Sequence, residues 1–315
     1  MHMKQIYIVI ILSLLAPVLS AQPVFNWSSQ EIKAGRNMQK MTVSNNAAVV
    51  AGYGRSFVKS TDNGATWNDV GILSTEFDFN NMSFKGNNGY LVANRSKLYD
   101  AFPDPYTNGI ILYTGDAGLN WANLDLSGLG SGDDPALDPS APKSYGLDFQ
   151  MVGCVNASTV YCSLRWLEFK PDTTTGYKEH SGIFRSADGG VNWKNISGDL
   201  KGAVINCFAF SDTVCYMGGN KKLYKGSTKS EVLTDIFANL NAGTTAFIND
   251  IQAVSKDEIY VITSTSGAFK STNGGDSFTK FNITGISGGN DLLKVDNNTL
   301  LLVGSSSKSR VSRDA

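Results

Sequence analysis

Charge and long apolar runs are both scarce in this sequence of 315 residues. Charged residues make up only 17% of the chain and the net charge is −1, so no surface suited to nucleic acid or anionic lipid is expected. After the apolar run at residues 6–15, no stretch reaches the roughly 18 apolar residues of a membrane-spanning helix. We therefore expect neither a nucleic-acid partner nor a membrane span.

Histidine, cysteine and proline are also few. The chain has two histidines and four cysteines, and no Cys-x-x-Cys spacing occurs, so a zinc site is not expected. Eight prolines stand against 32 glycines, a balance typical of many short strands joined by tight turns. The sequence thus favours an all-β protein without a bound metal or cofactor.

The first 21 residues have the pattern of a signal peptide. His2 and Lys4 precede the apolar run, and the small residues Ser20 and Ala21 precede the expected cleavage site. The first cysteine of the chain is Cys154, which argues against a lipid anchor at the new N-terminus. We expect an exported protein, secreted to the extracellular space, the periplasm or the cell surface, with residues 22–315 as its folded part.

An octapeptide of the pattern Ser/Thr-x-Asp-x-Gly-x-Thr/Asn-Trp recurs along the chain. Residues 60–67, 114–121 and 186–193 match it closely, and residues 271–278 carry Asn and Phe in place of Asp and Trp. Each copy follows a strand-like segment, so we expect a hairpin turn in which the Asp or Asn accepts amide hydrogens and the glycine takes a positive φ. The aromatic residue should begin the next strand and be buried against the neighbouring sheet. These structural residues are Asp62, Gly64, Trp67, Asp116, Gly118, Trp121, Asp188, Gly190, Trp193, Asn273, Gly275 and Phe278.

The spacing of the octapeptides predicts the architecture. Their third positions are 54, 72 and 85 residues apart, and a degenerate copy at Thr228 divides the last interval into 40 and 45 residues. A partial copy at residues 312–315 follows 41 residues later. Four-stranded propeller blades repeat every 40 to 45 residues or so. We expect an all-β propeller of four-stranded antiparallel blades, with six blades visible and six or seven in the full protein.

Each blade should contain strands A to D, with the octapeptide between C and D. Residues 24–27 resemble a D strand and are expected to complete the last blade, because a propeller must hide its edge strands. Two interpretations of the C-terminus remain open. Either the chain continues beyond Ala315 into a seventh blade or a sorting domain, or the segment of Trp27 supplies the missing strand of a six-bladed ring.

The octapeptide resembles the Asp box of sialidases and related propellers. Sialidases also carry an arginine in a Phe/Tyr-Arg-Ile-Pro motif, which is absent from this sequence, where Arg36 stands between Gly35 and Asn37. Sialidase activity is therefore not expected. At the level of box and blade, most of the chain is similar to photosystem II assembly and stability factors and to the sortilin ectodomain. That resemblance implies a scaffold that holds peptides or protein partners.

The cysteines form two evenly spaced pairs. Cys154 and Cys162 are eight residues apart, as are Cys207 and Cys215, and each pair spans an expected A–B hairpin. Antiparallel neighbours in a non-hydrogen-bonded pair come close enough for a disulfide, and exported proteins meet oxidants. We expect two hairpin disulfides; the alternative is four buried free thiols.

Long insertions predict a binding face opposite the octapeptides. Residues 94–108 and 165–180 lie between expected B and C strands, and residues 127–145 between D and A. Loops that grow on one face of a repeat array commonly bind ligands, and aromatic residues with polar neighbours suit sugars or peptides. The alternative is that Trp166 and Tyr106 only pin the loops to the body. The expected binding residues are Arg95, Tyr99, Tyr106, Arg165, Trp166, Glu168, Tyr177 and His180.

An acidic group lies on the same predicted face, at Asp100, Asp104, Asp133, Asp134 and Asp138. Calcium takes six or more oxygen ligands and could use some of them, but no EF-hand spacing is present, and solvated loop carboxylates are the alternative. Paired loop carboxylates also serve glycoside hydrolysis, as in the xyloglucan-type hydrolases that carry Asp boxes. The candidate catalytic residues are Asp133, Asp134 and Asp138.

Three functions follow from these patterns. The first is a secreted binding or assembly module for a protein or a glycan, the second a surface or matrix protein, and the third a glycoside hydrolase of sialidase or xyloglucanase type. Because the repeated residues are structural and the sialidase arginine motif is missing, we favour the binding module.

Overall fold

The computed structural model describes residues 27–31, 40–43, 49–53, 56–62, 65–72, 76–95, 109–126, 129, 144–169, 177–197, 205–211, 213–229, 232–242, 246–264, 266–281, 283, 289–296, 298–304 and 308–312. Nearly all of them lie in strands or tight turns. A short 3-10 helix, η4 (Phe237–Leu240), follows the fourth strand of one sheet. The expected signal peptide, residues 1–21, lies outside the described residues.

The strands form six four-stranded antiparallel sheets, the blades, numbered here in chain order. Blade 1 is β2 (Lys40–Val43), β3 (Val49–Tyr53), β4 (Ser56–Ser60) and β5 (Asn68–Ile72); blade 2 is β6 (Phe77–Lys85), β7 (Asn88–Arg95), β8 (Ile110–Thr114) and β9 (Ala122–Asn123). Blade 3 is β10 (Ser144–Cys154), β11 (Val160–Phe169), β12 (Tyr177–Ser186) and β13 (Lys194–Asn195); blade 4 is β14 (Ile205–Ser211), β15 (Val214–Gly219), β16 (Lys222–Ser227) and β17 (Leu233–Asp235). Blade 5 is β18 (Ile248–Ala253), β19 (Ile259–Thr263), β20 (Gly267–Ser271) and β21 (Thr279–Phe281); blade 6 is β22 (Gly289–Lys294), β23 (Leu300–Gly304), β24 (Lys308–Ser312) and β1 (Trp27–Glu31).

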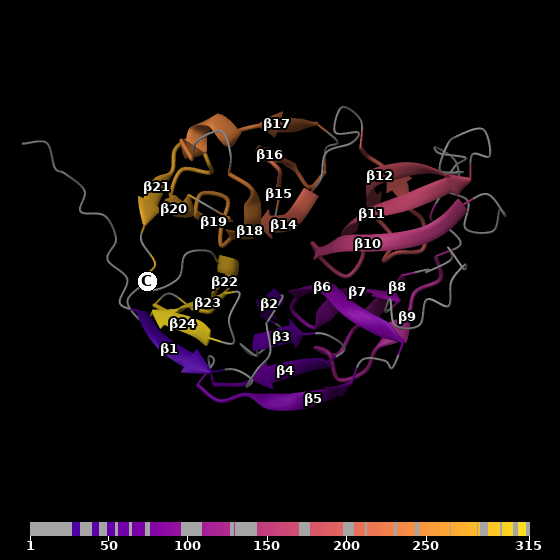
Figure 1. Ribbon diagram of the computed structural model, residues 1–315, viewed down its shortest axis with the longest axis horizontal. Helices are drawn as coiled ribbons and strands as arrows, with labels where there is room; N and C mark the ends of the chain where they lie inside the picture. The colour runs from indigo at the N-terminus through magenta and orange to yellow at the C-terminus, as the bar shows by residue number, and fades with distance from the viewer. Residues whose placement is uncertain are drawn as a thin grey trace, which may run out of the picture.

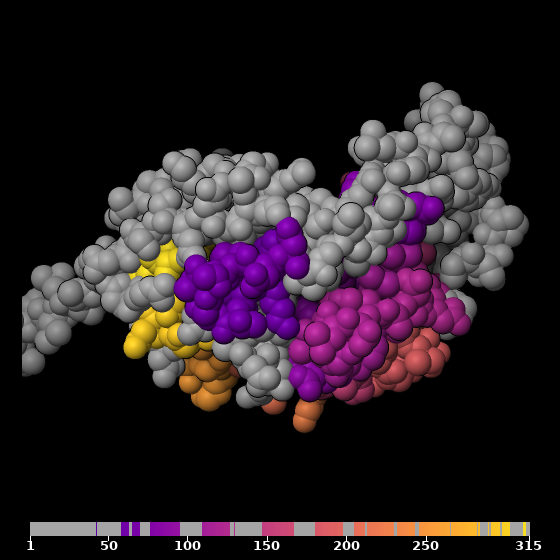
Figure 2. Space-filling view, turned by 90° about the horizontal axis from the view of Figure 1, so that it is seen from below, coloured from indigo at the N-terminus to yellow at the C-terminus, as the bar shows by residue number. Residues whose placement is uncertain are grey.

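The blades are arranged radially around a centre, as Figure 1 shows. The first strand of each blade contacts the first strand of the next, and β22 contacts β2, so these inner strands close a ring. Viewed from the side, blades 1 and 2 lie next to each other at the rim (Figure 2). The prediction of an all-β propeller with four-stranded antiparallel blades is confirmed.

The N-terminal strand completes the last blade. β1 pairs with β24 along its whole length, from Trp27 opposite Ser312 to Glu31 opposite Lys308. The expected strand at residues 24–27 therefore begins later, at Trp27, and residues 24–26 lie outside the described part of the chain. Because the first and last strands are paired, the ring is closed by backbone hydrogen bonds between the two ends of the chain.

A second repeated feature, which the sequence analysis missed, ties the blades together. The inner strands of blades 2 to 6 each carry a register shift at the same place, and the residue skipped is Asn or Gln. The amide nitrogens of Asn80, Asn206 and Asn249 donate to the backbone carbonyls of Phe149, Ile248 and Gly289, each in the next blade. The extra residue at a bulge is not paired with the neighbouring strand, so its side chain can point away from the regular pleat. Here these side chains form hydrogen bonds with the next blade.

The two expected disulfides are wrong, because all four cysteines are free and buried. In blade 3, Cys154 lies opposite Val160 and Cys162 opposite Val152, so the two cysteines are two residues out of register. In blade 4 the two cysteines are three residues out of register, with Cys207 opposite Gly218 and Cys215 opposite Phe210. Burial raises the pKa of Cys154 to about 12 and that of Cys215 to about 11. These two thiols are therefore neutral packing groups at physiological pH.

Among the described residues, no helix has the length and apolar character needed to cross a membrane.

Candidate binding site

The octapeptides, called boxes from here on, lie between the third and fourth strands of blades 1, 2, 3 and 5, as predicted. In blade 3 the Asp188 carboxylate accepts hydrogen bonds from the Ser186 hydroxyl at 2.7 Å and from the backbone and side-chain nitrogens of Asn192 at 2.9 and 2.8 Å. The hydrogen bonds from Asn192 and Ser186 lower the pKa of Asp188 to about 2. This carboxylate is therefore fully used in holding its own turn.

The other boxes repeat this arrangement with different donors. Thr66 donates its backbone N–H and its hydroxyl to Asp62, and Asn120 does the same for Asp116 with its backbone N–H and its amide. These bonds hold the pKa of both carboxyl groups at about 2, led by the Thr66 hydroxyl for Asp62 and by the Asn120 backbone for Asp116. In blade 5 the side chain of Asn273 donates to Ser277 instead.

The fourth and fifth positions of a box need a left-handed backbone. They are Ala117 and Gly118 in blade 2, with φ values of 60° and 87°, and Gly189 and Gly190 in blade 3, at 78° and 97°. Glycine adopts these values without a steric penalty, whereas Ala117 bears one. Gly64 of the first box lies outside the described residues.

The expected burial of the box aromatics holds fully for Trp193 alone, and each aromatic precedes its strand by one residue rather than beginning it. Trp193 is buried and donates its indole N–H to the Gly190 carbonyl at 2.9 Å. Trp121 meets Phe84 edge-on, with ring centroids 5.7 Å apart, and is half-buried, as are Trp67 and Phe278. The boxes thus stabilise the blades.

Buried tyrosines on the second strands link each blade to the next at the box end. Tyr90 donates to the Ala157 carbonyl at 3.0 Å, and Tyr161 donates to the Thr228 carbonyl at 3.1 Å. Tyr216 bonds the Gly274 carbonyl inside the box of blade 5 at 3.2 Å. Each hydroxyl thus caps the turn region of the following blade.

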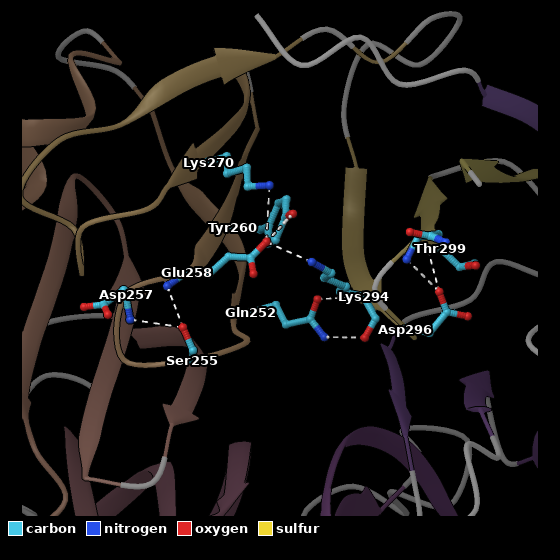
Figure 3. Close-up of polar contacts among 10 residues, drawn as sticks. Gln252, Ser255, Asp257, Glu258, Tyr260, Lys270, Lys294, Asp296 and Thr299 are labelled. Atoms are coloured by element: carbon cyan, nitrogen blue, oxygen red, sulfur yellow. Dashed lines mark hydrogen bonds and ion pairs between the residues drawn. The ribbon is translucent and has the colours of Figure 1, made fainter. Parts of the chain in front are cut away.

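Tyr260 departs from this pattern at the junction of blades 5 and 6, shown in Figure 3. Its hydroxyl donates to Glu258 at 2.8 Å, and the same carboxylate accepts from Lys294 at 2.9 Å and lies 3.2 Å from Lys270. Partial burial acts to raise the pKa of Glu258. The hydrogen bonds from Lys294, Tyr260 and Lys270 outweigh that effect and bring the pKa below its ordinary value. Burial raises the pKa of Tyr260, so this Tyr–Glu pair is a structural ion cluster rather than an activated nucleophile.

The centre of the ring holds a small cavity of about 130 Å³, lined by the inner strands. Its buried acceptors are engaged with the next blade: the side-chain oxygen of Asn81 accepts from the Val152 N–H at 3.2 Å, and that of Asp250 from the Leu292 N–H at 3.1 Å. Sites for organic ligands usually enclose about 300 to 1,000 Å³. The cavity suits water rather than an organic ligand.

Blade 3 has the longest strands, and their ends opposite the box form a polar group at its junction with blade 2. Asp148 accepts a two-point contact from the Arg165 guanidinium, at 2.6 and 3.2 Å, and a hydrogen bond from the Asn94 amide at 2.7 Å. The side chains of Arg165 and Asp148 are 50% and 37% exposed. On the other face of the sheet, His180 is half-buried and stacks on Trp166, with ring centroids 5.3 Å apart.

Five of the expected binding residues lie together in this hairpin. In the β11–β12 register Arg165 is opposite Ser181, Trp166 opposite His180, Glu168 opposite Lys178, and Phe169 opposite Tyr177. The expectation of a loop at residues 165–180 is therefore wrong over most of its length, because cross-strand pairing extends to Phe169 and resumes at Tyr177. Trp166 is only 2% exposed, between His180 and Phe184, so it anchors the hairpin and is not an open platform.

The remaining expected residues are dispersed or lie outside the described part of the chain. Arg95 ends β7 in blade 2. The residues outside are Tyr99, Tyr106, Asp100, Asp104, Asp133, Asp134 and Asp138. Among the described residues no group of three or more His, Cys, Asp or Glu side chains is placed to hold a metal ion.

No family model matches the chain. A curated relative, the chloroplastic photosystem II stability/assembly factor HCF136 of Arabidopsis thaliana, is 32% identical over 98 residues; the match covers 30% of this chain and 21% of that protein.

Two solved structures share the fold. A structure of YCF48 bound to D1 peptide matches 94% of this chain and all of its own, with a TM-score of 0.51 and 14% identity. The GH74 enzyme of Niastella koreensis matches 87% of this chain and 45% of its own, with a TM-score of 0.52 and 16% identity. The chain therefore has the β-propeller fold found in photosystem II assembly factors and in GH74 enzymes.

Proposed function

We propose that this protein binds a segment of a partner protein at the non-box end of blade 3, and that it does so outside the cytoplasm, as the signal-peptide pattern of residues 1–21 indicates. The observation that carries the proposal is the non-box end of β10, β11 and β12, where the side chains of Asp148, Arg165 and His180 are partly exposed. A propeller of similar fold, YCF48, has a structure with a bound peptide, which supports a protein partner.

Glycoside hydrolysis has less support among the described residues. A glycosidase needs two carboxyl groups facing one substrate bond, one of them free to give up a proton. The box carboxylates hold their own turns, Glu258 is engaged by Lys270, Lys294 and Tyr260, and Asp148 is engaged by Arg165 and Asn94.

The test is a comparison of ligand classes on one set of variants. Wild-type protein and the Arg165→Ala and His180→Ala variants would be probed with an unbiased peptide array, a glycan array and chromogenic glycosides. Lys229→Ala, an exposed change at the box end of blade 4, is the control. We expect peptide binding that both blade 3 variants weaken at least several-fold and the control leaves unchanged.

Other outcomes would point elsewhere. Binding confined to glycans would replace the protein partner with a carbohydrate, and turnover of a glycoside would make the protein a hydrolase. Peptide binding that responds to Lys229→Ala and ignores Arg165→Ala would move the site to the box face.

A further inference from the structure

The outer edge of blade 3 is covered over only part of its length. β12 runs for ten residues, whereas β13, the strand outside it, has two. Their pairing is limited to Phe184 with Asn195 and Arg185 with Lys194. Within the described residues, the segment from Tyr177 to Gly182 therefore pairs with β11 on one side and with no strand on the other.

Hydrogen bonds at the end of β12 that pairs with β13 show which backbone groups of β12 point outward, away from β11. The N–H of Ile183 donates to the Ser197 hydroxyl at 2.9 Å, and its carbonyl accepts from the Ile196 N–H at 2.8 Å, so both groups face away from β11. Both backbone groups of a residue in an antiparallel strand point to the same side, and the side alternates along the strand. The β11–β12 register has no shift, so Tyr177, Glu179 and Ser181 also direct their N–H and C=O groups outward.

Among the described residues, the third strand of no other blade extends so far beyond its fourth strand. β1 pairs with all five residues of β24, and β5 pairs with four of the five in β4. The third strands of blades 2, 4 and 5 have only five or six residues, of which at most three are not paired with the fourth strand. The free edge is thus a feature of blade 3, and it lies on the hairpin that carries Arg165 and His180.

We propose that the outer edge of β12 binds an extended segment of the partner protein as an added antiparallel strand, with a Lys or Arg of that segment opposite Glu179. This inference rests on the proposed function and states how the partner binds. Adding a strand to a sheet edge is a common mode of peptide recognition, in which the backbone supplies affinity and alternate side chains supply specificity. Opposite charges directly across a pair of strands are favourable, and Glu179 is central among the three outward-directed residues.

Two of the registers open to a second copy of this chain would place like charges opposite each other. Two copies related by a two-fold axis pair so that outward-directed residues meet outward-directed residues, and in full overlap Glu179 lies opposite Glu179 of the other copy. Moving the axis by one residue toward Tyr177 places Lys178 opposite itself, whereas moving it by one residue toward Gly182 places Glu179 opposite Ser181. Like charges directly opposite each other destabilise a pair of strands. A different protein with a basic residue at that position has no such conflict.

The test uses seven-residue peptides selected from an unbiased phage library on the wild-type protein. A selected peptide would be remade with single N-methyl groups at each position, since N-methylation removes one backbone donor at a time. The protein variant is Glu179→Pro, which removes the outward N–H at an edge position that tolerates proline. Glu179→Ala is its matched control, because it removes the charge and keeps the N–H.

If the peptide adds as a strand, N-methylation weakens binding to the wild type at least tenfold at alternate positions and little at the positions between. Glu179→Pro binds the peptide at least tenfold more weakly than Glu179→Ala does. Loss of the charge in Glu179→Ala weakens peptide binding by about fivefold at most. Basic residues are enriched at one position of the selected peptides. The N-methyl series needs no protein variant, so it tests the inference even if Glu179→Pro fails to fold.

The failures are distinguishable. Peptides that bind, respond to Arg165→Ala, and show neither alternation nor sensitivity to Glu179→Pro overturn the added strand and leave the proposed function standing. If no peptide is selected, the proposed function fails and the inference with it. A wild-type dimer in analytical ultracentrifugation that Glu179→Pro abolishes assigns the edge to a second copy and overturns the partner segment.

Discussion

The two ends of blade 3 differ in how their polar groups are used. At the box end, the hydroxyl of Ser186, the carboxylate of Asp188 and the amide of Asn192 bond to one another and to the turn backbone. At the opposite end, Arg165 and Asp148 form a partly exposed pair, and β12 extends beyond β13. The repeated end therefore builds the ring, and the irregular end presents partly exposed polar side chains. Mutations should separate the two: box-end changes alter stability, and changes at the other end alter binding.

The largest expected effect is at the box end of blades 5 and 6. Glu258→Gln removes the charge that Lys270 and Lys294 share, and the Lys294 side chain is only 9% exposed. Leaving a buried charged group without its partner costs about 1 to 3 kcal/mol. We expect the free energy of unfolding in urea to fall by that amount.

The control lies in the neighbouring turn. Asp257→Asn breaks an exposed ion pair with Lys256, whose side chain is 73% exposed, and should change stability by less than about 0.5 kcal/mol. The pH dependence has a definite sign. Because folding lowers the pKa of Glu258, its contribution is present above its unfolded pKa and is lost as the pH falls through the folded value. Equal effects of the two variants would contradict the distinction between cluster and surface pair.

A smaller effect is expected from exchanging one box chemistry for another. In the wild-type protein the Asn192 amide donates to the Asp188 carboxylate at 2.8 Å. Asp188→Asn places a second amide nitrogen there, and loss of this hydrogen bond should lower the free energy of unfolding by about 1 kcal/mol. The double variant Asp188→Asn with Asn192→Ser reproduces the blade 5 pair, in which Asn273 donates to Ser277 at 2.9 Å. It should recover most of the loss in thermal unfolding. A double variant no more stable than the single one would show that the third and seventh box positions are not coupled.

The sequence predicts the fold well because each box is a local structure. Its residues are at most seven apart, and Asp188 needs only Ser186 and Asn192 to form its turn. Pairings that depend on strand register could not be predicted so well. The spacing of Cys154 and Cys162 is compatible with several registers, and only the observed one places Val160 and Val152 opposite them.

The candidate site was predicted only in part, for a similar reason. Insertions marked residues 165–180, but length alone does not distinguish a loop from an extended hairpin. The links between blades, such as Asn249 to Gly289 and Tyr216 to Gly274, join residues 40 and 58 positions apart. Asn and Tyr at those positions have no distinctive local pattern, although their recurrence once per blade is a signal that an alignment of the repeats with one another would reveal.

A still smaller effect, of opposite sign, is expected in the blade 2 box. Ala117 has a φ of 60°, where the boxes of blades 3 and 5 have Gly189 and Gly274. Ala117→Gly relieves a left-handed strain of about 1 kcal/mol or more and loses part of it to the greater freedom of glycine in the unfolded chain. We expect a net gain of about 0.5 kcal/mol in urea unfolding. Ala122→Gly, in β9, is the control and should destabilise by a similar amount.

Arg165→Ala should have the smallest effect on stability. Its ion pair with Asp148 joins side chains that are 50% and 37% exposed, and such pairs contribute between 0 and about 1 kcal/mol, with screening by salt. We expect the unfolding midpoint to stay within about 0.5 kcal/mol of wild type while peptide binding falls several-fold. Arg165→Lys keeps the charge but not the two-point contact, so it should bind between wild type and Arg165→Ala. A large loss of stability in Arg165→Ala would mean that this end of blade 3 stabilises the ring as the box end does. That result would contradict the distinction between a stabilising end and a binding end.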